Sequence, residues 1–200
     1  MTKKLLITLS ILTLFANATK ASDNNSATHD EGVVINGVRW ATRNVDMPGT
    51  FAETPESFGM LFQWNRKKAW SMTDEEMEGW DSTNAEGTEW YAENDPCPEG
   101  WRVPTHIELN ALRIAGVGEW TTRNGVNGRY LGIVPDQIFL PTTGFLSARG
   151  GRGIINQSGA YWSSTPSGTT NALRILFDNT TINAVISSRA NAFAIRCVAK

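Results

Sequence analysis

Cysteine is the most reactive side chain in this sequence, and it occurs only twice, as Cys97 and Cys197. Two cysteines in an exported protein pair more often than not, because the compartment is oxidising. The alternative is a catalytic thiol, which needs a basic neighbour to hold it as a thiolate, and His106 is close enough in sequence to serve. A disulfide between the two cysteines is the favoured prediction.

The segment 144–159 carries charged and amide side chains among closely spaced glycines. Arg149 and Arg152 offer charge-assisted donors, and Asn156 and Gln157 offer donors and acceptors that can read hydroxyls or carboxylates. The run Arg-Gly-Gly-Arg-Gly resembles a phosphate-binding loop only loosely, because Gly-Lys-Ser/Thr is missing and no strand-to-helix context follows. A nucleotide site is not expected, and a long hairpin loop is the structural alternative to a ligand site.

An acid-rich segment, 71–94, follows Trp70 and contains two more tryptophans. Its carboxylates could bind Ca²⁺, but they lack EF-hand spacing, and no His/Cys/Asp cluster is present, so no metal is predicted. The favoured interpretation is an irregular insertion whose tryptophans anchor it to the core. If any tryptophan stacks on a sugar, we expect Trp80, Trp90 or Trp120, which lie in predicted loops.

The sequence contains no recognisable set of catalytic residues. His29 lies in a polar leader and His106 at a helix start, so a Ser-His-Asp arrangement cannot be argued. Two carboxylates could serve a glycosidase, but sequence spacing does not define their separation. We therefore predict a non-catalytic binding module without a cofactor. A structural or adhesin subunit and a hydrolase with an unlocated active site are the alternatives.

The segment 1–21 has the layout of a secretory signal peptide. Two lysines precede an apolar run over 5–15 that is too short to span a bilayer as a mature helix. Small-x-small sites allow cleavage after Ala21, which is favoured, or after Ala18, and an uncleaved anchor is the alternative. The protein is therefore expected to be secreted, periplasmic or on the cell surface, without membrane insertion after cleavage.

Removing the signal would take away three lysines and no acid, which changes the net charge from −2 to about −5. An acidic chain is not expected to bind nucleic acid or to dock on anionic lipid. The segment 22–31 is polar, lacks large apolar side chains and is predicted to be a disordered leader. The remaining residues, 32–200, fit one domain with a sizeable core.

The elements that must position these side chains are mainly strands. Asn36 and Gly37 lie between two β-prone runs and predict a two-residue hairpin turn. The segment 116–128 is interpreted as a Gly/Asn-rich connector. Further strands are predicted over 58–64, 129–134, 137–141, 171–178, 181–186 and 193–198.

One helix is predicted inside the stretch DPCPEGWRVPTHIELNAL, which starts at Asp95. Thr105 and Glu108 have the spacing of a capping box, so the helix should begin after Thr105. Its apolar face is expected to consist of Ile107, Ala111 and Ile114, with Leu109 and Leu112 nearby. The fold class that follows is α+β, with mainly antiparallel strands.

Three blocks of the sequence resemble a family of secreted and surface proteins from gut and rumen bacteria. They are 32–70, which includes GVRWATRNVDMPGTFA, the stretch DPCPEGWRVPTHIELNAL, and a C-terminal block with FLPTTGF, GAYWSST and AFAIRCV. These blocks are similar to the Fibrobacter succinogenes major paralogous domain, and the resemblance covers nearly the whole chain after the leader. It implies one domain over 32–200 and no established activity.

At one remove, the layout is similar to C-type-lectin-like domains and to formylglycine-generating enzymes. That fold has mainly antiparallel strands, one or two helices and long loops, and a helix cysteine bonded to one in the last strand. Cys97 and Cys197 occupy the equivalent places. The lectin calcium motif Glu-Pro-Asn or Gln-Pro-Asp is absent, and Trp162-Ser163-Ser164 replaces Trp-Asn-Asp. Binding without calcium is therefore expected.

The resemblance also implies where a ligand would bind, because lectin-like domains meet ligands on their long-loop face. In this chain that face is the loop 147–158, which leads into the next strand. We therefore predict a site for a glycan or a cell-surface protein. Its predicted residues are Arg149, Arg152, Asn156, Gln157 and Trp162.

Overall fold

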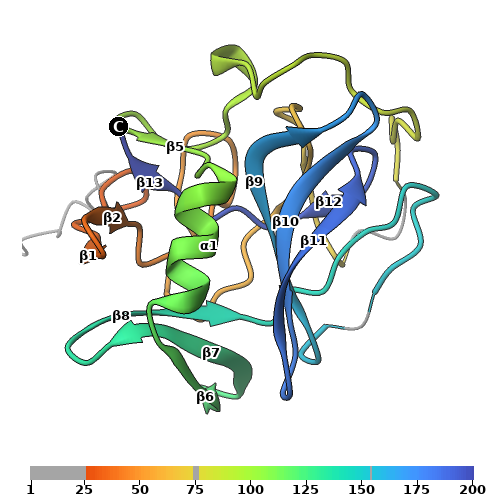
Figure 1. Ribbon diagram of the computed structural model, residues 1–200. Coiled ribbons are helices and arrows are strands. Elements are labelled where there is room, and N and C mark those ends of the chain that lie inside the picture. Colours follow the sequence, from red (N-terminus) through yellow and green to blue (C-terminus); the bar gives the residue numbers. More distant parts are fainter. Residues whose placement is uncertain (1–25, 74–76, 154) are drawn as a thin grey trace, which may run out of the picture.

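The computed structural model describes residues 26–73, 77–153 and 155–200 (Figure 1). The predicted signal peptide and residues 22–25 of the predicted leader lie outside these ranges. Within them, the protein is an α+β structure with one α-helix, one short 3-10 helix and four small antiparallel sheets. No helix of the described residues is long and apolar enough to cross a membrane.

The four sheets combine strands from distant parts of the chain. The first contains β1 (Val33–Ile35), β2 (Val38–Trp40), β13 (Val198–Ala199) and β5 (Trp101–Arg102), and the second contains β12 (Ala192–Phe193), β3 (Leu61–Gln63) and β4 (Ala69–Trp70). The third contains β6 (Val117–Arg123), β7 (Val126–Ile133) and β8 (Asp136–Pro141), and the fourth β11 (Ile182–Ser188), β10 (Asn171–Phe177) and β9 (Gly159–Ser167). The two helices are α1 (His106–Ile114) and η1 (Ala92–Asn94).

Asn-Gly turns shape two of the hairpins. Asn36 and Gly37 have φ angles of 50° and 78°, as the predicted two-residue turn between β1 and β2 requires. Asn124 and Gly125 have φ angles of 49° and 82° between β6 and β7. The prediction of a connector over 116–128 is therefore wrong, because the same dipeptide builds a second hairpin there.

The predicted capping box starts α1. The Thr105 hydroxyl accepts a hydrogen bond from the Glu108 N–H, and the Glu108 carboxylate accepts one from the Thr105 N–H at 2.8 Å. The same carboxylate pairs with Arg102 on β5. The cap therefore connects the helix to the strand before it.

The buried face of α1 differs from the predicted one. Leu109 and Leu112 are buried, whereas Ile107 and Ile114 are 81% and 64% exposed. The helix packs across β9, β10 and β11 on one side and touches β7 at its lower end in the view of Figure 1. A nine-residue helix in this position buries only the narrow stripe that meets the sheets, so the isoleucines point outward.

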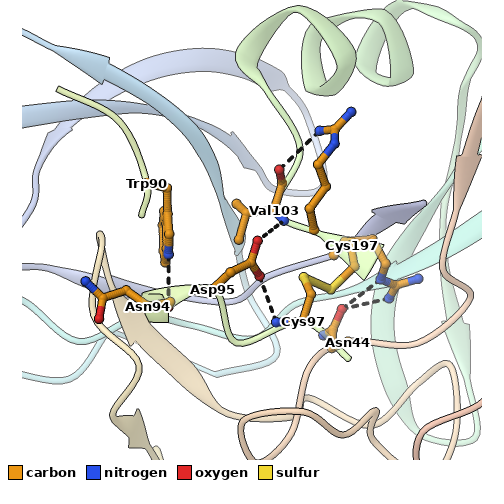
Figure 2. Close-up of a disulfide and its surroundings, with 9 residues drawn as sticks. Asn44, Trp90, Asn94, Asp95, Cys97, Val103 and Cys197 are labelled. Carbon is orange, nitrogen blue, oxygen red and sulfur yellow. Dashed lines mark hydrogen bonds between the residues drawn. A yellow bond between two sulfur atoms is a disulfide. The ribbon is translucent and has the colours of Figure 1, made fainter. Parts of the chain in front are cut away.

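A disulfide joins Cys97 to Cys197, whose Cα atoms are 6.1 Å apart (Figure 2). It confirms the predicted pair, and it overturns the alternative of a catalytic thiol. The Asp95 carboxylate supports the same turn by accepting from the N–H groups of Cys97 and Val103, at 2.9 and 3.1 Å. Burial raises the pKa of Asp95, against the lowering effect of these two hydrogen bonds.

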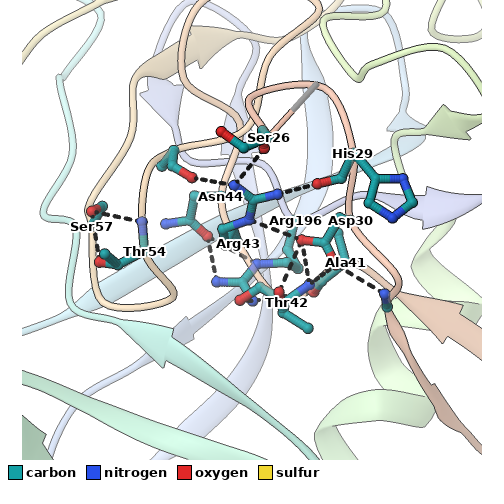
Figure 3. Close-up of polar contacts among 12 residues, drawn as sticks. Ser26, His29, Asp30, Ala41, Thr42, Arg43, Asn44, Thr54, Ser57 and Arg196 are labelled. Carbon is teal, nitrogen blue, oxygen red and sulfur yellow. Dashed lines mark hydrogen bonds and ion pairs between the residues drawn. The ribbon is translucent and has the colours of Figure 1, made fainter. Parts of the chain in front are cut away.

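The predicted last strand is divided into β12 and β13 by residues 194–197. Phe193, Ile195 and Cys197 still pack in one core cluster, as their alternation predicts. Arg196, between them, is also fully buried, and its guanidinium donates to the Asn44 side chain at 2.7 and 3.0 Å (Figure 3). Both sides of this segment therefore lie inside the protein.

Residues 26–31 are held against the body of the domain (Figure 3). The buried Asp30 carboxylate accepts from the N–H and hydroxyl of Thr42 and pairs with Arg43 at 3.3 Å. Arg43 also donates to the backbone oxygen of Ser26. The described part of the predicted disordered leader is therefore ordered, because one buried carboxylate and its arginine supply contacts that composition does not reveal.

Candidate binding site

A hollow of about 420 Å³ lies where the β6–β7 hairpin, the loop before β9 and the turn between β10 and β11 meet. It is termed the Trp120 hollow below. Its lining residues are Trp120, Asn127, Asn156, Gln157, Asp178 and Asn179. One indole, four amides and one carboxylate thus surround the space, which combines an apolar wall with hydrogen-bonding groups.

Two asparagines hold the loop side of the hollow. The Asn127 N–H donates to the Asn156 side-chain oxygen at 2.7 Å, and the Asn127 amide donates to the Asn156 backbone oxygen at 3.0 Å. Asn156 has a φ of 64°, a left-handed conformation that asparagine tolerates better than most residues. Within the described residues its amide nitrogen makes no hydrogen bond. A fixed donor is therefore available at the hollow, beside the exposed Gln157.

Asp178 supplies an ionised carboxylate. Its Oδ1 accepts from the hydroxyl and N–H of Thr180, both at 2.7 Å, and from the N–H of Thr181 at 2.8 Å. The Thr180 hydrogen bonds, followed by those of Thr181, lower the pKa of Asp178 to about 2. No described residue donates to its Oδ2, so this oxygen can accept from a ligand.

Arg129 holds the turn at Asp178 in place through a hydrogen bond to its backbone. It is buried on β7, pairs across the sheet with Trp120, and donates from Nε to the Asp178 backbone oxygen at 2.9 Å. Its Nη1 donates to the Gly118 backbone oxygen at 3.2 Å. One guanidinium therefore links the indole-bearing strand to the turn that carries the carboxylate.

The predicted site residues do not all lie in one place in the structure. Asn156 and Gln157 line the Trp120 hollow. Arg149 and Arg152 are exposed on the preceding turn and are not among the hollow's lining residues. The predicted loop therefore contributes its amides to a shared space, while its arginines lie apart from it.

The prediction of Trp162 as a ligand-binding residue is wrong. Trp162 is fully buried, its ring packs on Phe193 with a centroid distance of 4.5 Å, and its indole N–H donates to the Phe62 backbone oxygen at 2.8 Å. Its position on the inner face of β9 leaves no ring surface for a ligand.

The tryptophans of the acid-rich insertion act as anchors, as the favoured interpretation predicts. Trp80 packs edge-on against Trp70 at 4.9 Å and donates to the Ala148 backbone oxygen at 2.8 Å. Trp90 is buried and packs edge-on against Trp64 at 5.6 Å. Of the three predicted stacking candidates, Trp120 alone lines the hollow, half-buried.

Several partly or fully buried carboxylates have structural partners. Asp30 pairs with Arg43, and Glu108 pairs with Arg102. Glu56 pairs with Arg123 at 3.0 Å. Within the described residues, no group of three or more His, Cys, Asp or Glu side chains could hold a metal ion.

Comparison with family models, curated proteins and solved structures finds no match. The site is therefore assessed on its own geometry. Sequence reasoning did not predict Asn127, Asp178 and Asn179 as site residues, although two signals were present. The Asn124-Gly125 dipeptide predicts a hairpin that brings Asn127 to a strand end, and Asp-Asn-Thr-Thr is typical of a turn in which the aspartate caps the following N–H groups.

Proposed function

We propose that this protein is a non-catalytic carbohydrate-binding module and that the Trp120 hollow is its ligand site. The observation that carries the proposal is the combination of one half-buried indole with an ionised acceptor, Asp178 Oδ2, and a fixed donor, Asn156 Nδ2. Sugars present an apolar C–H face and a ring of hydroxyls, which match an aromatic wall and such polar groups.

The expected affinity for one sugar ring is low. A neutral hydrogen bond contributes about 0.5–1.5 kcal/mol net, because the ligand and the site both give up water. Gln157 and Asn179 are exposed and lose side-chain entropy on binding. An oligosaccharide of several rings is therefore the natural ligand of an open hollow of this kind.

The architecture proposed with this function is C-type-lectin-like, within the Fibrobacter succinogenes major paralogous domain family. The Cys97–Cys197 disulfide between the turn before the helix and the C-terminal segment supports it. The disulfide also supports export, because such bonds are typical of oxidising compartments. Binding should be insensitive to chelator, since the described residues contain no cluster of three or more His, Cys, Asp or Glu side chains that could hold a metal ion.

Glycan-array screening of the chain after residue 21, followed by calorimetry with the best neutral oligosaccharide, tests the proposal. Trp120→Ala should weaken binding about tenfold, which corresponds to ~1.4 kcal/mol. Gln157→Ala should weaken it by a smaller factor, because only one exposed amide is lost. The matched control is the Arg149→Ala, Arg152→Ala double variant, which should bind like the unaltered protein. Equal affinities for Trp120→Ala and the unaltered protein would place the site elsewhere.

A structural or adhesin subunit is the second candidate function. The observation that favours it is a set of exposed apolar side chains, Val34, Ile133 and Val134, at 48%, 71% and 75% exposure. All three line one hollow of about 220 Å³ beside the end of α1. Exposed apolar side chains that gather at one place are typical of protein contacts. Sedimentation analysis of an Ile133→Ser, Val134→Ser variant tests this function: it predicts that the unaltered protein associates and the variant does not.

A further inference from the structure

Tyr91 stands between two adjoining hollows of about 470 and 370 Å³, both of which it lines together with Glu86. It is 38% exposed, although its neighbour Trp90 is buried. Within the described residues its hydroxyl makes no hydrogen bond. The two hollows are termed the Tyr91 groove below. They lie apart from the Trp120 hollow and share none of its lining residues.

The loop that carries Tyr91 is held by hydrogen bonds from the buried side chain of Arg189. Arg189 is 1% exposed, stacks on the Trp64 ring at 4.1 Å, and donates to the backbone oxygens of Ala85 and Gly87 at 3.0 and 2.8 Å. Its remaining donors reach the backbone oxygens of 168 and 171. The groove floor is therefore fixed before any ligand arrives, which reduces the entropy cost of binding.

A buried asparagine fixes the other side of Tyr91. The Asn65 side-chain oxygen accepts from the Tyr91 N–H at 2.8 Å, and its amide donates to the Glu86 backbone oxygen at 3.1 Å. Asn65 has a φ of 54°, at the turn after β3. This turn continues directly into three cationic residues, so the aromatic ring and the cations belong to one connected unit.

The cations of that turn are Arg66, Lys67 and Lys68, which all line the groove. Arg66 pairs with Asp81, and Lys68 lies over the Trp70 ring at 4.3 Å while donating to the Glu78 backbone oxygen. Lys67 is exposed and, among the described residues, has no carboxylate partner. With the Arg66–Asp81 pair set aside, the lining of the groove holds two cations, Lys67 and Lys68, and one carboxylate, Glu86.

We infer that the Tyr91 groove is a second binding site, which takes acidic saccharides. Lys67 Nζ supplies a charge-assisted hydrogen bond to the ligand carboxylate, the Tyr91 ring supplies an apolar face, and the Tyr91 hydroxyl and the Asn94 side-chain oxygen meet sugar hydroxyls. A chain with this site and the Trp120 hollow holds two different stretches of polysaccharide.

The test uses two pairs of probes, each with and without a negative charge: trigalacturonate with its methyl ester, and 3′-sialyllactose with lactose. In at least one pair the acidic member should bind about tenfold more tightly than the neutral one, and added salt should reduce the difference. Amide NMR signals of residues 65–68 and 86–94 should shift on titration of that acidic probe.

Lys67→Gln should abolish the preference for the acidic probe, and the matched surface control Lys200→Gln should retain it. Tyr91→Ala should weaken both members of the pair, while Trp120→Ala should leave the acidic probe unaffected. The inference is overturned if neither acidic probe is preferred, if the shifts fall outside the groove, or if Lys67→Gln retains the preference. Because Lys67 and Tyr91 line the Tyr91 groove and Trp120 lines the other hollow, failure here is distinct from failure of the Trp120 hollow.

Discussion

The Nε atom of Arg129 lies 2.9 Å from the backbone oxygen of Asp178, so a buried guanidinium joins strand β7 to the turn after β10. Two different guanidinium nitrogens donate to this oxygen and to that of Gly118. A lysine has all its donors on one nitrogen and therefore cannot reach both oxygens. Arg129→Lys should therefore destabilise the protein by about 1–3 kcal/mol and weaken oligosaccharide binding in the Trp120 hollow. Urea unfolding and calorimetry measure the two effects. The exposed control Arg149→Lys should change neither.

The disulfide should contribute strongly to stability, because it closes a loop of 100 residues. Replacing Cys97 and Cys197 together by serine should lower the free energy of unfolding by up to ~4.7 kcal/mol in the chain-entropy model. Urea unfolding of the double variant against the oxidised protein checks this value. An unchanged midpoint would contradict it, as would two alkylatable thiols in the folded, oxidised protein.

Thr105→Ala should destabilise the protein by ~1 kcal/mol, since the Glu108 N–H loses its side-chain acceptor at the helix start. Thr105→Ser should retain most of that stability, because serine caps equally well. Denaturation midpoints of the two variants separate loss of the cap from loss of the methyl group. Equal midpoints for the alanine and serine variants would show that the cap contributes little.

Glu108 should make stability depend on acid pH. Burial alone would raise its pKa, but the pair with Arg102 and the hydrogen bonds from Thr105 outweigh burial and lower the pKa to about 2 from the ordinary 4.5. The folded-state pKa is the lower one, so this contribution is present above about pH 4.5 and is lost as the pH falls toward 2.

Free energies of unfolding across that pH range measure the contribution. Glu108→Gln should be less stable than the unaltered protein at neutral pH, and the two should converge in acid. The exposed control Glu119→Gln should keep the full pH dependence. A constant difference between Glu108→Gln and the unaltered protein at every pH would argue against an ionised Glu108 as the cause.

Arg189→Met should destabilise the protein by ~3 kcal/mol, because it leaves several backbone oxygens without their donors while keeping the stacking volume on Trp64. The loss should concentrate in the loop around residues 85–91. Relative to the unaltered protein, hydrogen exchange should therefore accelerate more at Gly87 and Tyr91 than at Leu112 of α1. Uniform acceleration at all three would indicate a global effect instead.

Signals that act within a few residues were readable from the sequence. The capping box at Thr105 and the turn at Asn36 each depend on groups two or three positions apart, so their chemistry is visible without the fold. The Cys97–Cys197 pair was predictable for a different reason, since a chain with two cysteines has one internal pairing to make. The α+β class followed from the same local patterns.

The binding surfaces depended on contacts between distant segments. Trp120 and Trp162 both occupy strands, but Trp162 meets Phe193 inside the core while Trp120 lies beside a turn formed by residues 178–181. Likewise, the buried Arg189 holds a loop about one hundred residues earlier, in which Trp90 is buried and Tyr91 is exposed. Which face of an aromatic residue stays open is decided by what packs against it, and spacing along the chain carries no record of that neighbour.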